Sequence, residues 1–289
     1  MKNILVVADP FEKEQLAFNK ALSLAKLTVA KIHVVLFCYE SLTIIEDEEE
    51  RERVKGMILD RTRQSWENYL EKTHVDIVVT YTLIWEKYID RWITEQCQSV
   101  QYDLLVKSGN RSETSFHTPT DWQLFRKLDV PVYSVSANAQ HLGKTVLAAL
   151  DLSSNKTAKK KLNKELLEAA FQLSVQTNSS LNICSCIKMP VILKDLGLAD
   201  LPERTVFIRK RIEKNAKLLL QQYDMHIDDV FIREGVPWKV IANYAKEINA
   251  DCIVIGSMGR RGIAGKIIGN TAEKVIHWCE SDLLVVPKG

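Results

Sequence analysis

The chain carries one pattern twice, and this repeat limits the fold more than any other feature of the sequence. A short apolar run near the start ends in Asp9, and a similar run in the second half ends in Asp151. In each half a helix-patterned stretch follows, and then a second apolar run, at 32–38 and 181–187. The order of elements matches although the identity between the halves is low, which indicates an old internal duplication.

The later part of each half repeats the pattern as well. Asp103 and Asp251 each precede an apolar run, and each half closes on a last run, at 132–135 and 283–286. Continuous apolar runs that alternate with helical patterns are typical of parallel strands buried on both faces. The sequence therefore predicts an α/β fold with two tandem doubly wound domains, each with a five-stranded parallel sheet. In the second half we expect strands at 145–150, 181–187, 229–233, 252–256 and 283–286.

Small polar residues fill the segment 136–143, where we place the linker between the halves. The expected domains are 1–137 and 144–289. A length of 289 residues agrees with two domains, since a typical domain has about 150 residues.

The composition excludes several classes of protein. With 39 basic and 37 acidic residues the formal net charge is +2, too balanced for a general nucleic-acid binder. Six cysteines are too sparse for a disulfide scaffold and indicate reduced thiols. The sequence has neither a signal-peptide core nor an apolar segment of membrane-spanning length. We therefore expect a soluble cytoplasmic protein without a nucleic-acid or membrane partner.

A glycine-rich loop after the expected strand at 252–256 is the one motif that indicates chemistry. Glycines let backbone N–H groups approach an anion, and Gly269 opens a helix whose N-terminus attracts negative charge. Asn270 and Thr271 are placed to cap that helix or to bond a phosphate, and Arg260 adds a cation to the loop. The spacing fits neither a Rossmann fingerprint nor a Walker A loop. The alternative is a flexible glycine loop that binds no ligand.

This loop resembles the nucleotide motif of the universal stress protein family, G-2x-G-9x-G followed by Ser or Thr. Gly256, Gly259 and Gly269 have the matching spacing, and Asp151 with the segment 235–237 also matches the family pattern. The resemblance covers both halves. The stretches 118–127 and 269–276 are similar to the tandem subgroup called universal stress protein E.

The resemblance implies a flavodoxin-like fold with strand order 3-2-1-4-5 in each half, and an ATP site in the second half with Mg²⁺ as the accompanying cation. Asp151 would contact the adenine side, and Cys186 or Ile187 would line it. Gly256 and Gly259 would line the path of the ribose and phosphates. The residues that would hold the phosphates are Gly269, Asn270 and Thr271. Asn270 departs from the family pattern, which has Ser or Thr at that position.

The first half departs further from the family pattern. Gly109 is the only glycine of its loop, and Thr118 followed by Pro119 stands where Gly269 stands in the second half. We therefore expect no ATP binding of the family kind in the first half. The resemblance also implies an internal pseudo-dimer of the two halves, and it leaves open a homodimer of whole chains.

The resulting hypothesis is a binding and regulatory stress-response protein that contributes to survival under stress, including DNA-damaging agents. We predict neither a catalytic residue nor a metal ligand. One alternative is a slow ATPase or phosphotransferase. Another is a protein that binds an apolar small molecule or a partner, with a vestigial nucleotide site and aromatic walls in the first half. Those walls would come from two expected helix faces, with Trp66, Tyr69, Trp85, Tyr88 and Trp92.

Overall fold

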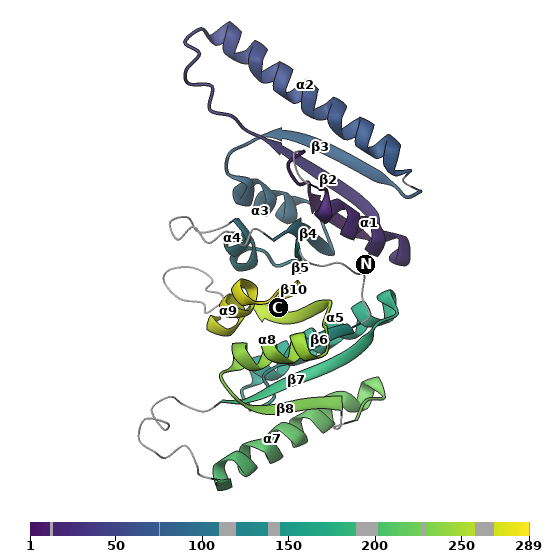
Figure 1. The fold of residues 1–289 in the computed structure, drawn as a ribbon, viewed down its shortest axis with the longest axis vertical. Helices are drawn as coiled ribbons and strands as arrows, with labels where there is room; N and C mark the ends of the chain where they lie inside the picture. Colours follow the sequence, from purple (N-terminus) through teal and green to yellow (C-terminus); the bar gives the residue numbers. More distant parts are fainter. Residues whose placement is uncertain are drawn as a thin grey trace. The chain divides into compact units, whose positions relative to one another are not determined.

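A computed structural model describes residues 1–11, 14–74, 76–109, 120–137, 145–188, 202–226, 229–257 and 269–288. Its contacts divide the chain into two units, Met1–Ala137 (unit 1) and Asn138–Gly289 (unit 2). Figure 1 shows the elements of each unit.

Unit 1 is organised around a five-stranded parallel sheet. Its strands lie in the order β3-β2-β1-β4-β5. Val6 of β1 lies opposite Val34 on one side and Val106 on the other, so the first strand is central. The strands are Asn3–Val7 (β1), Lys31–Cys38 (β2), Val79–Trp85 (β3), Leu104–Ser108 (β4) and Val132–Val135 (β5).

Unit 2 repeats this sheet with the order β8-β7-β6-β9-β10. Ala148 of β6 lies opposite Ile183 of β7 and Val254 of β9. The strands are Thr145–Leu150 (β6), Ser180–Lys188 (β7), Val230–Gly235 (β8), Cys252–Ser257 (β9) and Asp282–Pro287 (β10). Counted within each unit, both orders are 3-2-1-4-5, and the predicted doubly wound fold is confirmed.

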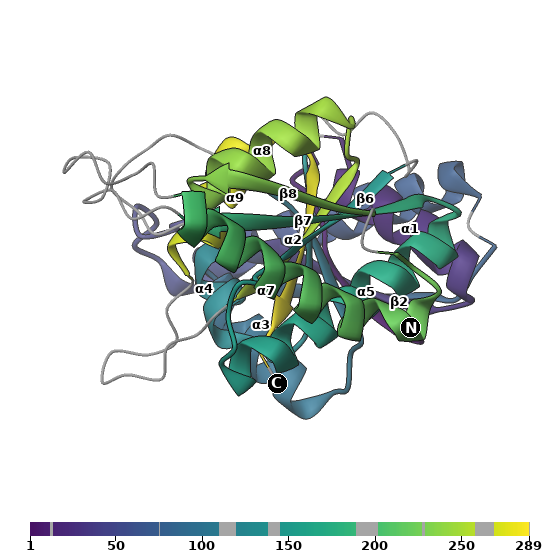
Figure 2. The same cartoon turned by 90° about the horizontal axis from the view of Figure 1, so that it is seen from below.

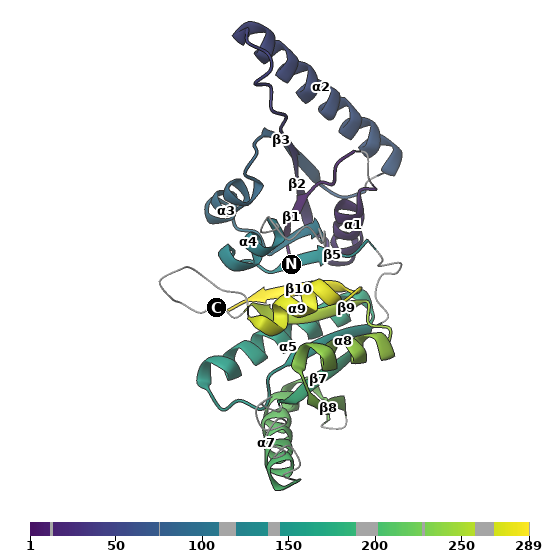
Figure 3. The same cartoon turned by 60° about the vertical axis from the view of Figure 1, so that its left-hand side comes forward.

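Helices cover both faces of each sheet, which explains the continuous apolar runs of the strands. The helices of unit 1 are Leu16–Thr28 (α1), Glu48–Thr73 (α2), Ile89–Ser99 (α3) and Thr120–Lys127 (α4). In unit 1, α1 and α2 cover one face and α3 and α4 the other (Figure 3). The helices of unit 2 are Thr157–Thr177 (α5), Pro202–Leu220 (α7), Gln221–Tyr223 (η1, 3₁₀), Pro237–Glu247 (α8) and Asn270–Trp278 (α9). In unit 2, α5 and α7 cover one face and α8 and α9 the other (Figure 2).

An aspartate joins the first and fourth strands at the amino edge of each sheet. The Asp103 carboxylate accepts hydrogen bonds from the backbone N–H groups of Asn3 (3.0 Å) and Lys2 (2.5 Å). In unit 2 the Asp251 carboxylate accepts one from the N–H of Thr145 at 2.9 Å. Burial raises the pKa of Asp103, but the N–H donors outweigh it and the net pKa is lowered. The aspartate that the sequence repeats before the fourth strand of each unit therefore links that strand to the first strand.

We predict that Asp103→Ala lowers the free energy of unfolding by about 0.5–1 kcal/mol, because two backbone donors exchange a charged acceptor for water. Urea denaturation measures the change. Asp76→Ala is the matched control, since Asp76 is exposed in the segment before β3. Equal stability of the two variants would contradict a stabilising role of Asp103 between the first and fourth strands.

Candidate functional site

The candidate site lies at the carboxyl edge of the unit 2 sheet, where parallel sheets bind ligands. Strand β6 ends at Leu150 and is followed by Asp151, while β9 ends in Gly256 and Ser257. The two strands are paired, with Val146 opposite Cys252 and Ala148 opposite Val254. Continued to the strand ends, this register brings Asp151 beside the start of the glycine-rich loop.

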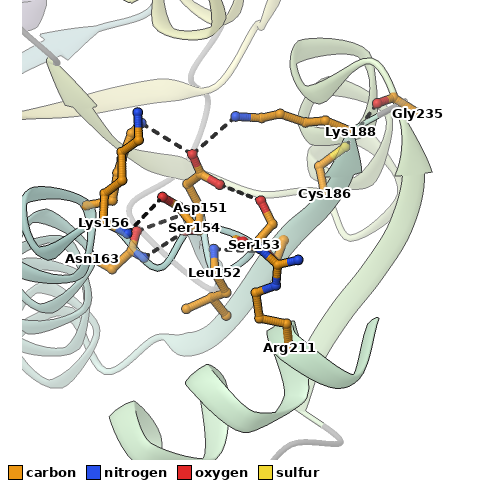
Figure 4. A network of polar contacts seen from close by, with 12 residues as sticks. Asp151, Leu152, Ser153, Ser154, Lys156, Asn163, Cys186, Lys188, Arg211 and Gly235 are labelled. Atoms are coloured by element: carbon orange, nitrogen blue, oxygen red, sulfur yellow. Dashed lines mark hydrogen bonds and ion pairs between the residues drawn. The ribbon is translucent and has the colours of Figure 1, made fainter. Parts of the chain in front are cut away.

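Two lysines hold the carboxylate of Asp151 (Figure 4). Its Oδ2 lies 3.1 Å from Nζ of Lys188 at the end of β7 and 3.3 Å from Nζ of Lys159 in α5. Its Oδ1 accepts a hydrogen bond from Ser153 Oγ at 2.9 Å. With two ammonium groups around one carboxylate, the cluster at Asp151 has an excess of positive charge.

This environment keeps Asp151 ionised. Partial burial by itself raises the pKa of Asp151, because a carboxylate loses solvation there. The ammonium groups of Lys188 and Lys159 and the Ser153 hydroxyl act in the opposite direction and prevail, so the net pKa is lowered. A carboxylate with a lowered pKa is a weak proton acceptor near neutral pH.

An amide clamp fixes the backbone of Asp151. Oδ1 of Asn163 accepts the Asp151 N–H, and Nδ2 of Asn163 donates to the Asp151 carbonyl, both at 3.0 Å. Asn163 is buried in α5. From the second strand of this unit, β7, Ser185 Oγ accepts a hydrogen bond from the backbone N–H of Leu152 at 3.3 Å. The start of the loop after β6 is therefore held rigidly beneath the candidate site.

Helix α7 supports the same loop from its other side. Arg211 donates to the carbonyl of Ser153 at 3.3 Å, and Asn215 donates to the carbonyl of Leu152 at 2.9 Å. The guanidinium of Arg211 adds a further positive charge near this edge.

Cys186 lies on β7, two residues before Lys188, and is buried. Its thiol donates to the carbonyl of Gly235 at 3.2 Å. Burial raises the pKa of Cys186 to about 11, so the group is a neutral thiol near neutral pH. Gly235 has a φ of +151°, a conformation that side-chain-bearing residues rarely adopt. Cys186 is therefore a buried, neutral thiol, and its contact with a ligand stays a prediction.

The predicted glycine motif lies partly within the described residues. A Cβ on Gly256 would come within 2.8 Å of Leu162 Cδ2, so a side chain at this position would displace Leu162 of α5. Gly269 is the N-cap of α9, and Asn270 and Thr271 form its first turn without a described side-chain cap. Gly259 and Arg260 lie outside the described residues.

Unit 1 uses the corresponding edge differently. The Asp9 carboxylate accepts hydrogen bonds from the Ala17 N–H of α1 (3.0 Å) and from Ser108 Oγ (2.8 Å). The buried Gln15 clamps the Asp9 backbone through both ends of its amide, as Asn163 does in unit 2. Asp9 therefore caps a helix, whereas Asp151 faces cations. The altered loop of this half, including Thr118 and Pro119, lies outside the described residues.

The aromatic residues of unit 1 correct one expectation. Trp85 and Tyr88 were expected on a helix face, but Trp85 ends strand β3 and Tyr88 is the N-cap of α3. The run of β-branched and aromatic residues before Trp85 favours a strand over a helix. Trp66 of α2 is fully buried, and its ring lies 5.1 Å from that of Phe18 and 5.6 Å from that of Tyr69. These rings fill the space between α1 and α2.

Sequence reasoning missed three site residues: Lys159, Lys188 and Asn163. The lysines reach Asp151 from two different elements, and a single sequence does not show which of the many lysines does so. Asn163 carried a usable signal, since a polar residue on the apolar stripe of an expected helix needs a buried partner.

The two sheets and their common strand order define a tandem doubly wound α/β protein, and its candidate ligand site lies where β6 and β9 end. A model of the universal stress protein family matches residues 1–136 and 144–287. The chain belongs to this family.

Relatives are similar over nearly the whole chain. A universal stress protein E homolog of Haemophilus influenzae is 30% identical, with 98% of this chain and 96% of that protein covered. Universal stress protein E of Escherichia coli K12 is 29% identical, with 99% and 93% covered. The expected resemblance to this subgroup is thereby confirmed.

Solved structures agree in fold. A protein of Pseudomonas aeruginosa PAO1 has a TM-score of 0.72 at 22% identity, with 99% of this chain and 92% of that chain covered. A universal stress protein of Archaeoglobus fulgidus has a TM-score of 0.63 at 20% identity, with 99% and 98% covered. Among the described residues, no helix combines the length and apolar character needed to cross a membrane.

We predict that Asp151→Asn lowers the free energy of unfolding by about 1–2 kcal/mol near neutral pH, because Lys159 and Lys188 lose their counterion. The folded-state pKa of Asp151 is lowered, so its contribution is present above the unfolded-state pKa and is lost as pH falls through the folded value. The difference between wild type and variant should therefore shrink toward acidic pH. Urea denaturation over a pH series measures it, and a difference independent of pH would contradict the ion-pair account.

Proposed function

We propose that unit 2 binds ATP, accompanied by Mg²⁺, at the carboxyl edge of its sheet. The chain would act as a cytoplasmic binding and regulatory protein that contributes to survival under stress, including DNA-damaging agents. The observation that supports this most is the pair of ammonium groups, Lys159 and Lys188, held at Asp151 beside the start of the glycine-rich loop.

The donors present fit a polyphosphate. In a parallel α/β unit the helices begin at the carboxyl edge, so the N-terminus of α9 points its free N–H groups toward the same side as Lys188. Gly269 has no side chain to cap that turn, and within the described residues no side chain caps it. Uncapped donors and an excess of cations favour an anionic ligand.

Each residue has a distinct role in this proposal. The Asp151 carboxylate, fixed by Asn163 and Ser153, would accept a hydrogen bond from the base or ribose. Lys188, half-exposed, would turn from Asp151 toward a phosphate, while the more buried Lys159 keeps the carboxylate paired. Bound ATP supplies a concentrated negative charge, which Asn270 and Thr271 would meet with backbone N–H groups.

Binding is favoured over catalysis by the state of the titratable groups. The lowered pKa of Asp151 makes it a poor general base, and the raised pKa of Cys186 makes it a poor nucleophile. We therefore rank the slow ATPase below a nucleotide-binding protein. The two ammonium groups at Asp151 favour an anionic ligand over an apolar one, so the apolar-ligand protein ranks lower as well.

Calorimetric titration with ATP and Mg²⁺ tests the proposal, and we expect one site per chain. Lys188→Ala should weaken binding about tenfold, since a charged hydrogen bond to phosphate is lost. Lys188→Arg should retain most of the affinity. Gly269→Glu should abolish binding, because a carboxylate at the N-cap would repel the phosphates.

Unit 1 supplies the matched control. Asp9→Asn changes the corresponding carboxylate and should leave the ATP affinity unchanged, although it weakens the cap of α1. Heat of binding that is the same in wild type, Lys188→Ala and Gly269→Glu would place any nucleotide elsewhere. An absence of heat, together with another small molecule retained in native mass spectra, would favour the apolar-ligand alternative.

A further inference from the structure

Charge is divided unevenly between the two units, although the whole chain is nearly neutral. Unit 1 contains 17 basic and 21 acidic residues, a net charge of −4, whereas unit 2 contains 22 and 16, a net charge of +6. Charge asymmetry of this size is a signal of interaction with a charged partner.

The excess of unit 2 is concentrated on α5 and α7, which lie on one face of its sheet (Figure 2). Together these two helices contain ten basic and four acidic residues. Arg211 and Asn215 of α7 donate hydrogen bonds to the loop before α5, and Tyr223 of η1, just after α7, donates one to Glu168 of α5. The exposed lysines of both helices therefore lie on the same side of the unit 2 sheet. We name this surface the basic face, and it consists of Lys160, Lys161, Lys164, Lys210, Lys214 and Lys217, all exposed.

Large apolar side chains stand among these lysines. Phe207 is 63% exposed and Leu218 is 64% exposed. Lys210 and Lys214 follow Phe207 by three and seven residues, which places them on one stripe of the helix. The guanidinium of Arg211 lies 5.0 Å from the centre of the Phe207 ring. Exposed apolar anchors inside a charged rim are the pattern of a protein interface.

Unit 1 has a surface of opposite charge at the start of α2. Six of the seven residues from 46 to 52 are acidic, and the six are exposed. Within the described residues Glu50 pairs with Arg53 and Glu52 with Lys55, while Glu48 and Glu49 have no described ion pair. We name this surface the acidic end, and it consists of Glu46, Asp47, Glu48, Glu49, Glu50 and Glu52.

The acidic end has apolar anchors of its own. Ile44 is 89% exposed just before the helix, and Met57 is 64% exposed. Met57 follows Glu50 by seven residues and so shares its side of α2. The two surfaces therefore complement each other in charge and in apolar content.

We propose that the basic face of one chain docks onto the acidic end of a second copy of this chain. Because the two surfaces differ, the contact is head-to-tail and leaves one free surface of each kind at the ends of an assembly. The association adds chains in an open series, and its exposed ion pairs make it weaken as the salt concentration rises. The proposal does not depend on nucleotide binding.

A charge-swap experiment on the full-length protein tests this contact. Sedimentation velocity over a concentration series should show species larger than the monomer at low salt. The association should be roughly tenfold weaker when the ionic strength rises from about 0.05 M to about 0.3 M. E48K/E49K lowers the formal charge of the acidic end from −6 to −2, and K210E/K214E lowers that of the basic face from +6 to +2. Each variant should therefore associate at least tenfold more weakly than the wild type at low salt. An equimolar mixture of the two variants should recover association as pairs, since the unaltered basic face of E48K/E49K then meets the unaltered acidic end of K210E/K214E.

The control variant is K239E/K246E, which makes the same charge change on α8, on the other face of the unit 2 sheet. It should associate like the wild type. Circular dichroism shows whether the reversed variants keep the native fold, and recovery in the mixture provides a second, independent check of folding.

Several results would overturn the proposal. One is a wild type that stays monomeric at low salt. Another is association that both reversals leave unchanged, or that the mixture fails to restore. A change of shape without a change of mass would indicate a contact within one chain. Binding of anionic vesicles or single-stranded RNA through the same lysines, by a protein that remains monomeric, would assign the basic face to another polyanion.

Discussion

Both units depend on the parallel pairing of their first strand with their fourth. In unit 1, Ile4 to Val6 pair with Leu104 to Val106, and unit 2 repeats this pairing between β6 and β9. One aspartate ties the paired strands at the amino edge, through Asp103 or Asp251. The same pairing aligns the loops that follow these strands at the carboxyl edge, so the candidate site is a consequence of the strand order.

The two units share the hydrogen bonds that fix the backbone after the first strand, but they differ in the partners of the carboxylate at that position. A buried amide clamps the backbone after the first strand in both units, although it comes from Gln15 before α1 in one and from Asn163 within α5 in the other. The carboxylates that this clamp positions have diverged. Asp9 caps a helix, whereas Asp151 pairs with Lys159 and Lys188 and so contributes to a cationic edge. The proposed ligand binding would thus belong to unit 2, whereas the corresponding carboxylate of unit 1 has a structural role.

Most of the fold was predictable because strands buried on both faces leave continuous apolar runs in the sequence. The strands expected at 145–150 and 252–256 are observed at Thr145–Leu150 and Cys252–Ser257. Trp85 was misplaced because aromatic spacing alone does not separate a strand end from a helix face. Of the site, Asp151 was predictable from the repeat. Its two lysines were not, because long side chains reach it from elements far apart in sequence.

Hydrogen exchange of the backbone amides, with and without ATP and Mg²⁺, tests the central claim most directly, because it locates the ligand as well as detecting it. The account predicts slower exchange in the loop after β6, from Leu152 to Lys156, and in the first turn of α9, with no change around Asp9 in unit 1. Protection confined to unit 1, or exchange that ATP leaves unaltered throughout, would contradict the assignment of the site.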